Sequence, residues 1–147
     1  MANTGERIDP VRNFNFLVEI DGIAQASFTE CTGLGSTTEV IEMREGGDNT
    51  RVRKLPGKTS FTDISLKWGL TSSTLLWNWR QVVIDGQPPF RRNGSIVVFD
   101  LANRTEVTRW NFVRAWPTKW EGPALNAKGN DIAIDTLVIA HEGLTRA

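Results

Sequence analysis

Few residues of this chain could carry out catalysis. The 147 residues include one histidine, His141, and one cysteine, Cys31. A structural zinc site needs four nitrogen or sulfur ligands and a disulfide needs two cysteines, so the sequence predicts neither. A hydrolase would have to work through His141, which lies in no catalytic motif. We therefore expect His141 to be a strand-end residue with a local hydrogen bond, and Cys31 to be a small buried hydrophobic residue.

Two other patterns approach known motifs without completing them. Gly57-Lys58-Thr59 resembles the end of a phosphate-binding loop, but Val52 stands where the first glycine belongs, and a strand rather than a helix is expected to follow. Asp131 and Asp135 lie four residues apart on an expected strand, hence about 13 Å apart at roughly 3.3 Å per residue. That separation exceeds the spacing of paired glycosidase carboxylates. The sequence predicts no enzyme and no cofactor.

Composition and charge limit the class of partner. The chain has 17 Lys and Arg against 17 Asp and Glu, and 39% of its residues are hydrophobic. Balanced charge argues against a dedicated binder of nucleic acid or anionic membrane, because both depend on a net basic surface. The length of the chain predicts a single domain, residues 1–147. No secretory signal and no run of 18 apolar residues is found, so we do not expect export by a cleaved signal peptide.

Hydrophobic periodicity predicts several strands and one helix. Period-2 alternation, which is typical of strands, covers residues 14–20, 61–68 and 106–116. Strands are also expected over residues 37–43, which are rich in β-branched side chains, and over residues 95–101 and 131–141, parts of which are apolar on both faces. Asp21-Gly22 is a strong hairpin signal, with a return strand over residues 23–32. Residues 117–130 have the composition of a turn-rich connection. The predicted fold is mainly β, an antiparallel sandwich or barrel with one flanking helix.

The helix is expected over residues 73–84. Ser72 or Ser73 could cap its start, and Gly86 follows its end. Its apolar stripe comprises Leu75, Leu76, Trp79, Val82 and Val83. Trp77 and Ile84 lie off this stripe but on a common line of their own. They could pack peripherally on the same domain or contact another subunit.

Residues 44–58, REGGDNTRVRKLPGK, interrupt the strand pattern with four glycine or proline residues and almost no apolar side chains. A loop of this length inside a compact domain is uncommon, and it is usually functional or disordered. Two interpretations follow from the residues: a solvated loop, or an arm that becomes ordered when it docks on a partner.

Several ordered segments carry a resemblance that covers nearly the entire chain. They are residues 12–23 (RNFNFLVEIDGI), 39–49 (EVIEMREGGDN), 53–57 (RKLPG), 110–113 (WNFV), 115–117 (AWP), 119–123 (KWEGP) and 139–144 (IAHEGL). In this order they resemble the tail-tube protein family of contractile phages and of phage-tail-like contractile injection systems. That family is related to the type VI secretion tube protein.

The resemblance implies a structural protein rather than an enzyme. Six β-barrel-like protomers of the family form a ring, and rings stack into a hollow tube inside a contractile sheath. The tube pierces a target envelope when the sheath shortens, and it carries DNA in phages or effector proteins in injection systems. Implied partners are further copies of the chain, sheath protein, baseplate and tail-terminator proteins and the cargo, with no sequence-specific binding of nucleic acid. Assembly is expected in the bacterial cytoplasm, as part of a virion tail or injection particle.

Three groups of residues receive expected roles. Residues 44–58 match the family's extended loop, which reaches toward the adjacent ring, so the expected inter-ring contacts are Arg44, Glu45, Gly46, Gly47, Asp48, Asn49, Arg51, Arg53 and Lys54. Alternation alone suggests side chains that line the lumen: Asp63, Ser65, Lys67, Arg109 and Asn111. Trp77 and Ile84 are candidates for a subunit contact.

Other functions remain open at this point. The resemblance does not separate a phage tube from an injection-system tube, nor the main tube subunit from a paralogue that starts the tube at the baseplate. A stand-alone β-sandwich could instead bind sugar or peptide on exposed tryptophans. An enzyme centred on His141 would lose its activity in the His141→Ala variant, whereas tube assembly would be nearly indifferent to that change.

Overall fold

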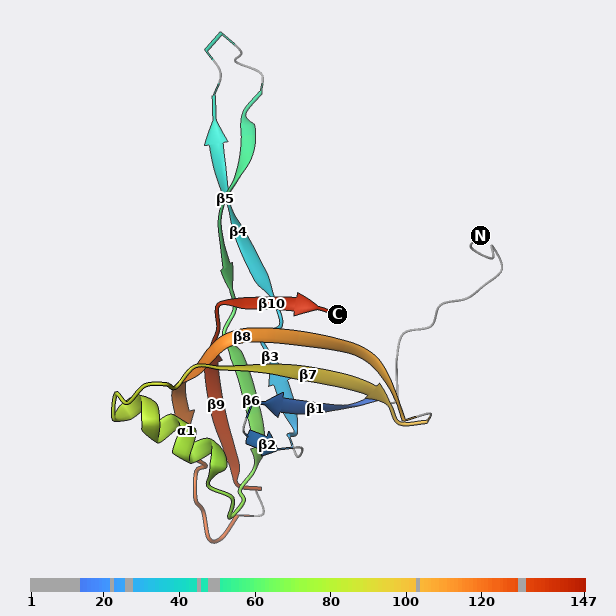
Figure 1. The fold of residues 1–147 in the computed structure, drawn as a ribbon, viewed down its shortest axis with the longest axis vertical. Helices are drawn as coiled ribbons and strands as arrows, with labels where there is room; N and C mark the ends of the chain where they lie inside the picture. Colours follow the sequence, from blue (N-terminus) through green and yellow to red (C-terminus); the bar gives the residue numbers. More distant parts are fainter. Residues whose placement is uncertain are drawn as a thin grey trace.

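Ten strands and one helix make up the described part of the chain in the computed structural model (Figure 1). The structure describes residues 14–21, 23–25, 28–44, 46–47, 51–102, 104–129 and 132–147, with no account of the side chains of 23–25. The elements are β1 Phe14–Ile20, β2 Ile23–Gln25, β3 Glu30–Thr32, β4 Ser36–Met43, β5 Arg53–Phe61, β6 Ile64–Gly69, α1 Leu75–Ile84, β7 Arg92–Asp100, β8 Thr105–Glu121, β9 Ile134–Ala140 and β10 Gly143–Arg146.

The long strand β8 joins two sheet layers. The main sheet has the order β2-β1-β7-β8-β9-β6-β3, with β10 also paired to β8, and all of its pairings are antiparallel. Residues 105–115 of β8 pair with β7, whereas residues 116–121 pair with β9. Figure 1 shows β1, β7 and most of β8 lying across β6 and β9. The prediction of a mainly β, antiparallel sandwich with one helix is confirmed.

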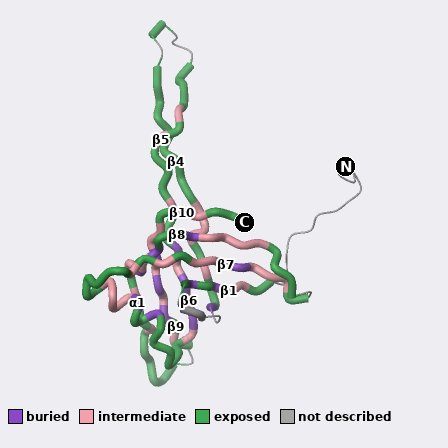
Figure 2. The backbone as a smooth tube through the Cα atoms, in the orientation of Figure 1, coloured by how far each residue is buried: buried purple, intermediate pink, exposed green. Residues whose placement is uncertain are grey.

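Alternating apolar residues from both layers form one core. Ile64 and Leu66 of β6 and Leu137 of β9 are completely buried, and they belong to one cluster with Val18 of β1 and Phe112 of β8. Figure 2 shows buried stretches on β1, β6, β7 and β9, near the place where the layers cross. Period-2 alternation places such residues on one face of each strand. The two apolar faces therefore cover each other.

The helix packs on the core by a narrower stripe than the sequence suggested. It begins at Leu75, with Thr74 in the N-cap position and no side-chain cap, so the prediction that Ser72 or Ser73 caps it is wrong. Leu76 and Trp79 are its buried residues, whereas Leu75 is 47% exposed. Trp79 Nε1 donates to the carbonyl oxygen of Phe90 at 2.6 Å. This bond satisfies the one polar atom of an otherwise apolar side chain.

Several predicted boundaries are wrong, and two of the errors involve proline. Residues 53–58, expected in a loop, are the first part of β5, and residues 117–121 continue β8. Pro56 is compatible with β5 because that strand has a neighbour on one side only, and edge strands tolerate a residue that lacks an N–H. In β8, the register shifts between Pro117 and Lys119. Proline composition alone does not reveal these tertiary settings.

Two further differences concern short strands. The second strand was expected to run to residue 32, but β2 ends at Gln25, and β3 is a separate strand that pairs with β6. The sequence analysis also missed β10, a four-residue strand that pairs with β8. The hairpin predicted after β1 is confirmed, since Ile20 pairs with Ile23, although Gly22 lies outside the described residues. Asp131 lies outside the described residues.

Candidate functional site

The hairpin of β4 and β5 stands away from the rest of the molecule (Figure 1). We call residues 36–61 the arm and the remainder the body. The two strands pair only with each other, from Ser36 opposite Phe61 to Met43 opposite Arg53. All eight residues of β4 are exposed, as the colouring of Figure 2 makes plain. Residues 44–58, expected as one long loop, are thus partly an ordered strand.

The arm has apolar side chains that the body does not cover. Ile41 lies opposite Leu55 on one face, and Ile41 and Met43 are each 49% exposed. A side chain on Gly57 would meet Ile41 Cδ1 at 3.1 Å, so the glycine leaves room for the isoleucine. On the other face, Val40 is 63% exposed. An isolated two-stranded hairpin is at best marginally stable in water. Within the described chain, the apolar side chains of the arm therefore gain little from burial.

The expected inter-ring residues gather at the distal end of the arm. Arg44, Arg51 and Lys54 are exposed there, and Lys54 lies opposite Glu42. Gly47 has φ 92°, a conformation that glycine adopts without strain. Of the remaining candidates, Gly46 and Arg53 are also exposed, while Glu45, Asp48 and Asn49 lie outside the described residues. Contact with an adjacent ring stays a prediction.

A glycine and the single histidine fix the base of the arm. Gly33 has φ 92°, and a Cβ atom there would lie 2.0 Å from the carbonyl oxygen of Asp63. His141 Nε2 lies 3.0 Å from the carbonyl oxygen of Thr62, and Nδ1 lies 3.1 Å from that of Gly143. The imidazole ring also lies 5.6 Å from the Phe61 ring. The predicted local role of His141 is confirmed: it connects the end of β9 to the base of the arm.

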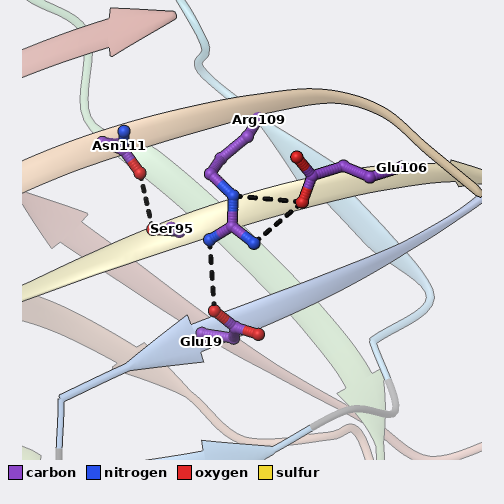
Figure 3. Close-up of polar contacts among 5 residues, drawn as sticks. All are labelled: Glu19, Ser95, Glu106, Arg109 and Asn111. Atoms are coloured by element: carbon purple, nitrogen blue, oxygen red, sulfur yellow. Dashed lines mark hydrogen bonds and ion pairs between the residues drawn. The ribbon is translucent and has the colours of Figure 1, made fainter. Parts of the chain in front are cut away.

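Two of the candidate lumen residues lie on the outer face of the β1–β7–β8 layer (Figure 3). Arg109 Nη2 is 2.8 Å from a Glu106 carboxylate oxygen, and Arg109 Nη1 is 3.3 Å from Glu19 on β1. The hydrogen bond to Glu106 is the main reason that the pKa of Arg109 is raised. Ser95 Oγ and Asn111 Oδ1 are 2.7 Å apart. This face therefore carries a fixed network of both charge signs.

The other three candidate lumen residues lie on β6 or next to it, away from Arg109 and Asn111. Ser65 and Lys67 alternate with buried residues of β6 and face outward from the opposite layer, where Lys67 Nζ is 3.6 Å from Glu30. On that same layer, a hydrogen bond from Lys119 lowers the pKa of Glu121. Asp63 lies between β5 and β6 at the base of the arm. The structure does not bring the five candidate lumen residues together. One sheet face can present either Arg109 with Asn111 or Ser65 with Lys67, but not both pairs.

Trp77 and Ile84 remain partly exposed on α1, at 43% and 55% respectively. The Trp77 ring meets Trp120 edge-on, with centroids 5.1 Å apart, and Trp120 meets the buried Trp68 at 5.2 Å. Trp77 thus packs on its own domain and still presents an apolar edge. The subunit contact stays a prediction.

The single cysteine and the possible metal ligands were the remaining candidates for chemistry. Burial raises the pKa of Cys31 from 9.0 to about 11, which keeps the thiol protonated near neutral pH. Within the described ranges, no group of three or more His, Cys, Asp or Glu side chains could hold a metal ion. No helix in the part of the chain that the structure covers is long and apolar enough to cross a membrane.

Comparison with protein families decides what this architecture is. The model of the T4-like virus tail tube protein gp19 family matches residues 12–145. The chain belongs to this tail tube family. A comparison with the curated proteins finds no match. The family is one of structural tube proteins, and the resemblance predicted from the sequence is confirmed.

Several solved structures share the fold of this chain. A chain in the cryo-EM structure of the anti-feeding prophage tube-terminating cap is 25% identical, with a TM-score of 0.81 and coverage of 100% of this chain and 99% of that one. A chain in the baseplate structure of the same prophage is 25% identical, with a TM-score of 0.79 and coverage of 96% and 97%. Hcp1 from Flavobacterium johnsoniae, 14% identical, has a TM-score of 0.56 and coverage of 90% and 94%, which reflects the fold alone.

Proposed function

We propose that this chain is the inner-tube subunit of a contractile tail or injection system. Copies form hexameric rings, and the rings stack into a hollow tube inside a sheath. The tube serves as the piercing rod and as a conduit for DNA or effector protein. The observation that carries the proposal is the family match over residues 12–145. Similarity to chains of the anti-feeding prophage cap and baseplate structures supports baseplate and terminator proteins as partners. Sheath protein is a further partner in this proposal.

The arm supplies the means of stacking in this proposal. Its exposed apolar faces and its basic tip match what a contact with another copy needs: apolar area to bury, and charge to set the orientation. A ring uses heterologous contacts, in which one patch meets a different patch of the next copy. Stacking of rings in one direction is heterologous in the same way, since the arm of one copy reaches a different surface of a copy in the next ring.

Electron microscopy of the purified protein tests the proposal. We expect rings or hollow rods from the unaltered chain, and isolated rings without long tubes after deletion of residues 46–51. Leu125→Ser is the matched control, because Leu125 is 81% exposed but lies far along the chain from the arm, between β8 and β9. Normal tubes from the deletion variant would contradict the stacking role.

Microscopy, together with a melting measurement, separates the two alternative functions. A tube-initiating paralogue would form single rings that add no further copies of themselves but nucleate rods of a second tube protein. A stand-alone binding module would stay a monomer at every concentration. Its melting temperature would rise with a sugar or peptide ligand.

A further inference from the structure

A pocket bordered by three arginines opens where β1 ends and β7 begins. Its volume is about 390 Å³, and its lining residues are Asp21, Pro89, Arg91, Arg92, Asn93 and Arg114. Arg91 and Arg92 are consecutive, but Arg114 comes from β8. The register of β7 and β8, which places Arg92 opposite Ala115, brings the third arginine to the other two.

The guanidinium groups are only partly neutralised within the chain. Arg92 Nη1 donates to the carbonyl oxygen of Asp21 at 2.6 Å, while Arg92 Nε is buried without a hydrogen-bond partner. Arg91 Nη1 lies 3.6 Å from one oxygen of Glu142, and Arg114 Nε donates to the other. A single carboxylate thus serves two arginines. A buried donor that has lost water and gained no partner is costly, and it favours binding of an acceptor.

The backbone at Arg114 is held in an unfavourable conformation. Its φ of 52° lies in the left-handed region, which is unfavourable for a residue with a side chain. The Arg114 amide donates to Asn93 Oδ1 at 3.0 Å, a bond from the neighbouring strand that helps to hold this conformation. Such backbone positions concentrate where a side chain must be presented in a particular direction.

We propose that this pocket binds a carboxylate group supplied by a neighbouring copy of the chain. The planar guanidinium fork matches a carboxylate with two parallel hydrogen bonds. Because the chain is neutral overall, with 17 charges of each sign, the positive pocket has acidic counterparts elsewhere on the same chain. Among the described residues, the exposed Glu39, Glu42 and Asp63, in or beside the arm, have no ion pair. The choice of a second copy as the source rests on the proposed function.

Titration with a free dicarboxylate tests the site on dispersed protein. We expect glutarate to shift the backbone amide resonances of Arg92, Asn93 and Arg114 saturably, and the doubly substituted variant Arg91→Gln with Arg114→Gln to bind at least tenfold more weakly. Arg104→Gln is the matched control, because Arg104 is exposed, lies outside the pocket and has a similar φ of 51°. Absence of a saturable shift would overturn the site. Tighter binding of inorganic phosphate at equal ionic strength would overturn its assignment to a carboxylate.

Assembly tests the source of the carboxylate. We expect the doubly substituted variant to need about ten times more protein than the unaltered chain before rings or rods appear, and Arg104→Gln to need no more. A variant that binds no glutarate yet assembles normally would exclude a second copy as the source. If the unaltered chain never assembles, both the proposed tube function and the assignment of the carboxylate to a second copy are overturned. The glutarate titration still decides whether the pocket binds a carboxylate.

Discussion

The body and the arm use the same antiparallel pairing but bury their side chains in opposite ways. In β6 of the body, Ile64, Leu66 and Trp68 are at most 2% exposed, whereas every residue of β4 in the arm is exposed. Both strands are rich in apolar residues. The difference arises because a second layer covers β6, while within this chain the arm has only its own two strands. Local sequence therefore predicts a strand but not what covers it.

The largest expected effect separates two tryptophans of one aromatic cluster. Trp68→Ala removes a side chain that is 2% exposed and should lower the free energy of unfolding by about 3–5 kcal/mol. Trp77→Ala removes one that is 43% exposed and should cost about 1 kcal/mol. Denaturant unfolding of dispersed protein, followed by circular dichroism, measures both. Equal costs would mean that Trp77 belongs to the core.

The next effect distinguishes the base of the arm from its tip. Gly33 and Gly47 both have φ 92°, but only Gly33 has a backbone oxygen, that of Asp63, where a Cβ atom would lie. Gly33→Ala should therefore lower the free energy of unfolding by about 3 kcal/mol, because the added Cβ atom overlaps the Asp63 oxygen and the left-handed backbone is strained. Gly47→Ala should cost about 1 kcal/mol from strain alone. The same unfolding measurement compares them, and a mild Gly33→Ala variant would show that the base of the arm can open.

A smaller effect tests what the apolar face of the arm does. Substitution of Ile41 and Met43 by serine should change the stability of dispersed protein by less than about 0.5 kcal/mol, because both side chains are half exposed. Under the proposed function, it should raise the protein concentration needed for tubes about tenfold, which corresponds to 1.4 kcal/mol. Sedimentation of assembled material measures this concentration. Leu125→Ser again serves as control, and equal effects of the two changes would argue against a specific role of the arm.

The smallest effect concerns a buried carboxylate in the body. Burial raises the pKa of Asp135 above its ordinary value of 3.8, so the ionised form is less favourable in the folded than in the unfolded chain. This residue therefore favours folding most below pH 3.8, and that contribution is lost as the pH rises through the folded-state pKa. Asp135→Asn should raise the melting temperature at pH 7 and have little effect at pH 3.5. Asp63→Asn, at an exposed position, controls for the loss of one charge.

The sequence predicted the body better than the arm. Alternation located β1, β6 and the first part of β8, the Asp21-Gly22 pair located the first hairpin, and the helical stripe located α1 within two residues. Each of these signals is local, since it depends on neighbours within one strand, turn or helix. The prediction for residues 53–58 was wrong because Pro56 and Gly57 normally break strands. The free edge of a two-stranded arm accommodates them.

By itself, the sequence determined the mainly β class, the poverty of catalytic groups and the family resemblance, because these depend on composition and on the order of short segments. Only the tertiary structure decided that β8 joins two layers, that the candidate lumen residues divide between two outer faces, and that Arg114 meets Arg91 and Arg92 at a pocket. These features depend on strand register and on the crossing of the layers. Both are fixed by packing between residues far apart in the chain.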